Sequence, residues 1–264
     1  VQTCALPILV LFIGHGRGAT RWLDFGVVRF QPSEIMKIAL PLILAWYFER
    51  HEGSMNWRNF VVAALLVALP FGLVVRQPDL GTALLIGASG FFVLYLAGLD
   101  WRIIVGGALV GGLTFWGAWE FNWLHDYQKE RILTVFNPQQ DAQDAGWHTT
   151  QAAIAIGSGG LLGKGWLNGT QTHLEFLPEK HTDFIFAVYG EEFGLLGCAV
   201  LVLLYLLMIG RCFLIAANAS TLFGRLMAGS MTLMFFTYAF VNMGMVTGML
   251  PVVGVPLPFM SFGG

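Results

Sequence analysis

The sequence predicts an all-α protein that crosses a membrane several times. Three observations support this fold class: 56% of the 264 residues are hydrophobic, only 11% are charged, and the mean hydropathy is +0.68. Soluble domains carry about 25% charged residues, and here the apolar residues gather in runs near the ~20 residues that a spanning helix needs. The formal net charge of -2 is uninformative, and no basic run suggests nucleic acid as a partner.

The first part of the sequence alternates polar loops with apolar runs. Residues 1–14 are expected to end an apolar helix, and residues 15–33 form a polar loop. A helix is predicted over residues 33–49, with Pro32 in its first turn, where a missing N–H is tolerated. Further apolar spans are predicted at residues 60–75, 80–99 and 102–119.

Residues 120–182 hold many of the polar residues and no run of membrane length. They predict a long loop, in which residues 149–157 form a short interfacial helix. The glycine-rich run at residues 157–165 lacks the spacing of a phosphate-binding loop, so we expect a flexible elbow there.

The last part of the sequence contains two full spans, at residues 183–210 and 225–249. Three prolines after them, at positions 251, 256 and 258, predict a loop or a re-entrant segment. The cysteines Cys4, Cys198 and Cys212 lack metal-ligand spacing. Cys198 and Cys212 lie in or beside an apolar run, so free thiols with packing roles are expected.

Five segments carry a resemblance, in this order: RWLDFGVVRFQPSEIMK, QPDLGT, IAIGSGGLLGKGWLNGTQ, FLPEK followed by HTDFIFAVYGEEFG, and GMLPVVGVPLPFMSFGG. Together they resemble the SEDS family, the polytopic glycosyltransferases of bacterial cell-wall synthesis, over residues 9–264. The motifs GSGGLLGKGW and NGTQ are closer to the sequence of RodA, the elongation member, than to that of FtsW, the division member.

The resemblance implies a multi-pass protein of the bacterial inner membrane. The family has ten membrane helices, so residues 1–264 are expected to form a single transmembrane domain with about seven of them, truncated at both ends. A simple count of Lys and Arg would place residues 120–182 in the cytoplasm. The family places this loop outside the cell, and we follow the family.

Asp183 is the predicted catalytic residue. It lies where a polar stretch meets an apolar run, and from the sequence alone a helix N-cap is the more ordinary interpretation. The resemblance makes it the family's candidate catalytic acid, which would act as general base for an acceptor sugar hydroxyl. Ala187, Gly190 and Gly194 share its helix face and would let a ligand or helix approach.

Two pairs of charged residues are predicted to bind substrate. Glu34 and Lys37 share a helix face. They form either an ordinary exposed pair or a site in which Lys37 holds the substrate's pyrophosphate and Glu34 orients it. Asp79 is expected to cap the helix that begins at Leu80, and it also lines the outward cavity in the functional interpretation. Arg76 then offers a fork for phosphate oxygens.

Other charged residues give weaker signals. Arg21 is equally well explained as an interface anchor, with Trp22 beside it, or as a substrate-binding residue. Lys180 is included among the substrate-binding candidates. For Glu191 and Glu192, deeper along the same helix as Asp183, we expect a structural pair with another helix and not a second catalytic acid.

The resemblance implies that the protein polymerises lipid II, with membrane lipids around it and a class B penicillin-binding protein transpeptidase as partner. A divalent cation, Mg²⁺ or Mn²⁺, is a candidate cofactor for offsetting the pyrophosphate charge. Three alternatives stay open at this point: a transporter (flippase) of the lipid-linked precursor, an FtsW-like role in division, and a scaffold that recruits the transpeptidase. The charged residues cluster toward one side of the membrane, which favours a polymerase over a transporter.

Overall fold

The computed structural model describes residues 23–24, 29–54, 56–77, 79–121, 129, 133, 145–170 and 182–262. The predictions made for residues 1–14, Arg21 and Lys180 lie outside this part. The chain divides into two compact units. Unit 1 comprises Val1–Ile104 and Gly210–Met234, and unit 2 comprises Val105–Ile209 and Phe235–Gly264.

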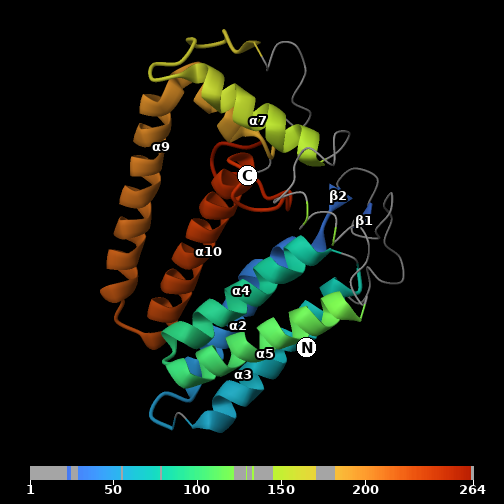
Figure 1. The fold of residues 1–264 in the computed structure, drawn as a ribbon. Helices are drawn as coiled ribbons and strands as arrows, with labels where there is room; N and C mark the ends of the chain where they lie inside the picture. Colours follow the sequence, from blue (N-terminus) through green and yellow to red (C-terminus); the bar gives the residue numbers. More distant parts are fainter. Residues whose placement is uncertain are drawn as a thin grey trace. The chain divides into compact units, whose positions relative to one another are not determined.

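The described residues are overwhelmingly helical, which confirms the predicted fold class (Figure 1). The helices are α2 (Pro32–Arg50), α3 (Trp57–Val75), α4 (Leu80–Leu96), α5 (Trp101–Glu120), α7 (Ala145–Gly159), α9 (Ile185–Ala217) and α10 (Leu222–Val246). Two short strands, β1 (Leu23–Asp24) and β2 (Arg29–Phe30), pair antiparallel within the predicted loop at residues 15–33, where only loop was expected.

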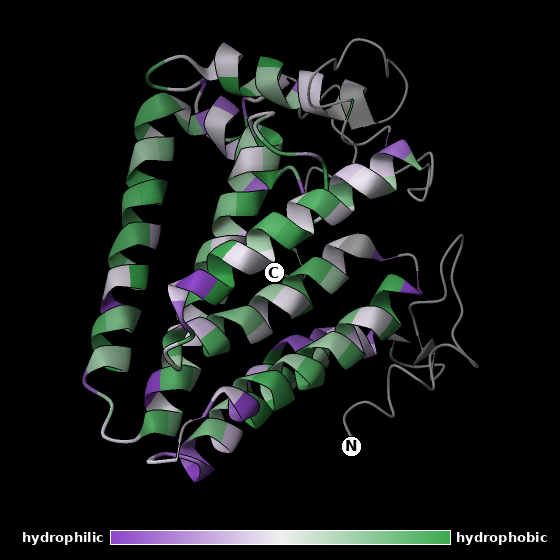
Figure 2. Cartoon of the chain, turned by 60° about the horizontal axis from the view of Figure 1, so that its bottom comes forward, coloured by the Kyte–Doolittle hydropathy of each residue, from purple (hydrophilic) through white to green (hydrophobic). Residues whose placement is uncertain are grey.

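Several helices suit a membrane. Within the described part, α3, α5, α9 and α10 are long and apolar enough to span a bilayer, and α4 is a shorter apolar helix. Hydrophobic residues predominate along the helices (Figure 2). Between residues 120 and 182, the structure describes helix α7, whose 15 residues are fewer than a membrane span needs. The chain is therefore a multi-pass membrane protein.

The core of unit 1 forms around α2. Its apolar residues Met36, Leu40, Leu44 and Phe48 recur at helical spacing and are all buried. They belong to a hydrophobic cluster that includes residues of α3 and α4. Gly90 of α4 allows α3 to come close, since a Cβ at Gly90 would lie 2.4 Å from a methyl carbon of Val67.

The core of unit 2 joins α7, α9, α10 and the segment after α10. The rings of Tyr205 on α9 and Phe235 on α10 lie 5.5 Å apart, and the Tyr205 hydroxyl donates to the carbonyl oxygen of Pro258 (2.5 Å). The proline-bearing segment is thus tied to α9, in the loop conformation that the prolines predict.

Helix α9 is interrupted at Gly194, whose φ of 66° and ψ of -166° are not helical. The break divides α9 into a short first part, residues 185–193, and a second part, residues 195–217. At 1.5 Å per residue the second part is about 33 Å long, enough to cross a hydrocarbon core of about 30 Å by itself.

The segment 160–170, which we call the clasp, fills the break. In an unbroken helix the amides of Leu195 and Leu196 would donate to the carbonyls of Glu191 and Glu192. Instead, they donate to the carbonyls of Gly160 and Leu161 (2.9 and 3.1 Å). The freed carbonyls of Glu191 and Glu192 accept from the amides of Lys164 and Gly165 (3.1 and 3.0 Å).

The clasp corrects the prediction of a flexible elbow at residues 157–165. Glycines at the end of α7 and in the clasp allow close packing. A Cβ at Gly159 would lie 2.2 Å from the Gly190 carbonyl oxygen, and one at Gly163 would lie 2.1 Å from the Glu192 carbonyl oxygen. Since backbone groups left unpaired at membrane depth cost several kcal/mol each, the clasp also stabilises the break.

Candidate functional site

Asp183 lies in a turn of three residues directly before α9, and its side chain is half-buried. Its carboxylate faces the segment after α10, because a Cβ at Gly254 would lie 3.4 Å from Asp183 Oδ2. Gly254 has a φ of 76°, a left-handed conformation that glycine adopts easily. The predicted general base is therefore at a helix start, with its carboxylate beside the backbone of Gly254.

The backbone of this turn is anchored on both sides of the predicted base. Asn242 Nδ2 donates to the carbonyl oxygens of Asp183 (2.9 Å) and Val255 (2.7 Å). Ser261 Oγ donates to the carbonyl oxygen of Thr182 (2.5 Å) and accepts from the amide of Leu257 (2.7 Å). These contacts join α10, the proline-bearing segment and the Asp183 turn into one assembly that holds the backbone of Asp183.

Asn242 is fully buried and uses both donor positions of its amide in this way. Its Oδ1 is the one buried side-chain oxygen or nitrogen in the described part of the chain that lacks a hydrogen-bond partner. An unpaired buried acceptor costs about 1–3 kcal/mol. The geometry at Asp183 and Val255 is thus kept despite a local cost.

Glu34 and Lys37 form the ion pair that their spacing predicts. Glu34 Oε2 and Lys37 Nζ lie 2.6 Å apart at the first turns of α2. Lys37 is buried, with 7% of its surface exposed, whereas the Glu34 side chain is 54% exposed. The buried cation distinguishes this pair from an ordinary surface pair, because a buried Lys needs a partner to keep its charge.

Asp79 is confirmed as the cap of α4. Its Oδ1 accepts from the amide of Thr82 (3.2 Å) and its Oδ2 accepts from the Thr82 hydroxyl (2.9 Å). Gln31 Nε2, just before α2, also donates to Asp79 Oδ2 (3.4 Å). The side chain of Arg76, which directly follows α3, is exposed. Four predicted residues of unit 1 therefore lie at the start of α2, just after the end of α3 and just before the start of α4: Glu34, Lys37, Arg76 and Asp79.

Substitution of Asp79 separates its capping role from a role in binding. Asp79→Ala is expected to lower the free energy of unfolding by about 1 kcal/mol, since it removes an N-cap. Asp79→Asn keeps the cap and is expected to retain the melting temperature in detergent. A lower activity of Asp79→Asn at unchanged melting temperature would then measure the charge alone. An Asp79→Ala protein as stable as the parent would contradict the capping role.

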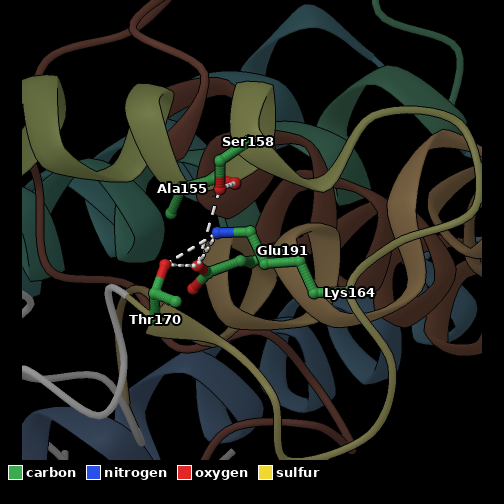
Figure 3. A network of polar contacts seen from close by, with 5 residues as sticks. All are labelled: Ala155, Ser158, Lys164, Thr170 and Glu191. Carbon is green, nitrogen blue, oxygen red and sulfur yellow. Dashed lines mark hydrogen bonds and ion pairs between the residues drawn. The ribbon is translucent and has the colours of Figure 1, made fainter.

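Glu191 and Lys164 form a second ion pair, in unit 2 (Figure 3). Glu191 is fully buried, and its Oε1 lies 2.7 Å from Lys164 Nζ. Thr170 Oγ1 accepts from Lys164 Nζ (2.7 Å) and donates to Glu191 Oε1 (3.0 Å), while Ser158 Oγ lies 3.5 Å from the same oxygen. This confirms the structural pair expected for Glu191. The partner, however, comes from the clasp and not from another helix.

Sequence reasoning missed Asn242, Ser261 and Lys164. A lone polar residue inside an apolar run is a signal, because such residues are rare in membrane helices unless they have partners. Asn242 has that signal. Nothing in the sequence could show that Lys164 meets Glu191, which lies 27 positions later.

Other predicted features have these outcomes. Cys198 and Cys212 are free thiols, as expected. Within the described residues, no three His, Cys, Asp or Glu side chains are grouped closely enough to hold a metal ion. Asp183 belongs to unit 2, whereas Lys37 and Arg76 belong to unit 1. Their convergence on one cavity stays a prediction.

Comparison with known proteins supplies the family. A family model described as "Cell cycle protein", covering FtsW, RodA and SpoVE, matches residues 2–264. The peptidoglycan glycosyltransferase MrdB of Escherichia coli is 55% identical over 248 residues, which cover 94% of this chain and 67% of that protein.

Two solved structures have the same architecture. One is a chain from a peptidoglycan synthase complex, with a TM-score of 0.82 and 32% identity, and the match covers 99% of this chain and 73% of that one. The other is the rod shape determining protein RodA of Thermus thermophilus, with a TM-score of 0.68 and 29% identity, covering 99% and 69%.

Proposed function

The chain belongs to the FtsW, RodA and SpoVE family of cell cycle proteins, and we propose that it is a peptidoglycan glycosyltransferase. Its reaction is the polymerisation of lipid II into glycan strands on the outer face of the bacterial inner membrane, during cell elongation and shape maintenance. The observation that carries this proposal is the 55% identity to the Escherichia coli glycosyltransferase over 94% of the chain. The RodA-like resemblance of the sequence agrees with it.

Asp183 is proposed as the general base. Chain extension requires a sugar hydroxyl to attack an anomeric carbon that carries a lipid pyrophosphate. The hydroxyl becomes a better nucleophile when a carboxylate takes its proton in the transition state. Asp183 is half-buried at a helix start, and its carboxylate lies beside the backbone of Gly254. These features suit a group that must reach a substrate while its backbone is held.

Lys37 and Arg76 are proposed to offset the negative charge of the leaving pyrophosphate. Positive charge placed where negative charge develops stabilises a transition state, and an Arg fork fits phosphate oxygens well. A divalent cation, Mg²⁺ or Mn²⁺, is proposed to help offset this charge, held by the substrate's own phosphate oxygens.

A second role is proposed alongside the first: docking of a class B penicillin-binding protein transpeptidase. The supporting observation is the match to a chain of a peptidoglycan synthase complex that coordinates polymerization and crosslinking. A scaffold and a polymerase are compatible, because the polymerising residues and a docking surface need not overlap. Two alternatives must be distinguished from a polymerase by experiment: transport of the lipid-linked precursor, and an FtsW-like role in division.

The test is product formation from labelled lipid II. The purified protein in liposomes, with the transpeptidase partner present, is expected to yield glycan chains of increasing length on gels. Movement of lipid II between leaflets without any chain would favour the transporter. Depletion of the protein in cells tests the FtsW-like role. That role would be favoured if glycan synthesis then stopped during division but continued during elongation.

Substitution of Arg76 tests its part in stabilising the leaving pyrophosphate. Arg76→Ala removes an exposed cation and is expected to lower kcat/KM for lipid II roughly tenfold, a loss of about 1.4 kcal/mol of transition-state stabilisation, with the melting temperature unchanged. Arg102→Ala, at the exposed start of α5, is the matched control and should leave kcat/KM unchanged. An Arg76→Ala enzyme with the parent's kcat/KM would remove Arg76 from the proposed site.

A further inference from the structure

We propose that Lys164 and Glu191 are positioning residues for Asp183: their ion pair keeps the clasp closed over the break in α9 and so fixes the short first part of that helix. The proposal rests on the proposed function in one respect, the role of Asp183 as general base. Neither residue is proposed to touch the substrate.

The first part of α9, residues 185–193, is held at both ends. At its start, Asn242 and Ser261 hold the carbonyls of Asp183 and Thr182. At its end, the clasp accepts and donates the hydrogen bonds that the break at Gly194 removes from the helix. A nine-residue helix in the middle of this arrangement has little stability of its own, so its position depends on these two anchors.

The backbone of the clasp is strained at Leu167, which indicates that its surroundings hold it in place. Gly160, Gly163 and Gly165 have positive φ angles that glycine adopts easily, but Leu167 also has a positive φ, 61°. For a bulky residue this conformation is disfavoured, and such strain persists only where neighbouring contacts enforce it. A side-chain contact that holds the clasp against α9 would help to maintain this conformation.

The Lys164–Glu191 pair supplies that interaction. Glu191 is fully buried, Lys164 is 27% exposed at its side chain, and the charged atoms are 2.7 Å apart. Thr170, near the far end of the clasp, contacts both of them. The pair thus connects the clasp to the first part of α9 by side chains, close to the place where two backbone hydrogen bonds, from the amides of Lys164 and Gly165, already connect them.

Loss of the ion pair should change the positions that Asp183 occupies. Without Lys164, the buried carboxylate of Glu191 would lose the cation that lies 2.7 Å away, and the clasp would lose its ion-pair link to α9. The end of the short helix would then move more freely, and Asp183, two residues before its start, would sample positions from which it cannot reach the acceptor hydroxyl. A misplacement of about 1 Å can lower a rate on the order of 100-fold.

The experiment uses the purified protein with its transpeptidase partner and three variants: Lys164→Met, Lys164→Arg and the control Arg102→Met. Hydrogen–deuterium exchange is followed for the peptides that cover residues 160–170 and 185–196, and kcat and KM are measured with lipid II. For Lys164→Met we expect faster exchange in both peptides and a kcat lower by roughly 10- to 100-fold, with KM unchanged. Lys164→Arg should restore most of the kcat, and Arg102→Met should match the parent.

Faster exchange confined to residues 160–170, with kcat unchanged, would show that the clasp does not position Asp183. A fall in kcat without faster exchange at residues 185–196 would equally overturn the proposal. Should Lys164→Met fail to fold, the double variant Lys164→Met with Glu191→Met removes the buried acid as well, and it is expected to show faster exchange in both peptides. If instead Asp183→Asn were fully active, the proposed function would fail, while the exchange result would still decide whether the two segments are coupled.

Discussion

Replacement of Asp183 by Asn is expected to lower the rate of lipid II polymerisation by about 10²- to 10⁴-fold, the usual contribution of a general base. Asn has nearly the same volume as Asp but cannot take a proton. The anchors at Asn242 and Ser261 bind the backbone carbonyls of the turn and not the Asp183 side chain, so the substitution leaves them intact. The loss should therefore fall on kcat, with the melting temperature and lipid II binding unchanged.

Asp100→Asn is the matched control for this measurement. Asp100 also stands at a helix start, where its Oδ1 accepts from the amide of Arg102 (3.0 Å). It has no proposed part in the reaction, and Asn preserves the cap. Equal rates for Asp183→Asn and the parent would remove Asp183 as the base. A similar loss in both variants would show that a general effect of acid removal, and not base catalysis, explains the result.

The helices could be predicted from the sequence because long apolar runs have few alternatives in a membrane. The ends of the helices were predicted less accurately. The span predicted to end at residue 99 stops at Leu96, because Gly98 adopts a φ of 95°. The span predicted to end at residue 210 continues to Ala217, since one exposed Arg211 does not stop a helix whose next residues are again apolar.

The candidate site was predictable only where neighbours in sequence are neighbours in space. Glu34 and Lys37 are three residues apart on one helix, and Asp79 caps the helix that it precedes, so spacing alone revealed both contacts. Contacts between distant segments left no such pattern. The pairing of Lys164 with Glu191, and the anchoring of Asp183 by Asn242, follow from how the chain packs.

Glycine at position 163 illustrates the same limit. In the sequence, the glycines at positions 157–165 are compatible with flexibility, and this was the wrong interpretation. In the structure Gly163 has a φ of 79° and packs against the backbone of α9 at the break. The absence of a side chain is what allows the clasp to close, so its role is close packing.

Gly163→Ala is accordingly expected to have the largest effect on stability. A Cβ there would lie 2.1 Å from the Glu192 carbonyl oxygen and 2.7 Å from the Gly194 amide nitrogen. Both are backbone atoms and cannot rotate away. We expect a loss that exceeds about 4 kcal/mol, the range of severe core substitutions, and hence little folded protein or a melting temperature in detergent lower by on the order of 10 °C.

Gly160→Ala distinguishes packing from backbone strain. Gly160 also lies in the clasp with a positive φ, 59°, but a Cβ there would meet nothing within 4 Å. Alanine in this conformation costs roughly 1–2 kcal/mol, so this variant should fold and lose only a few degrees of melting temperature. The difference between the two variants measures the contact of Gly163 with α9. If both variants melted together, strain alone would explain the glycines, and the close fit of the clasp at the break would be refuted.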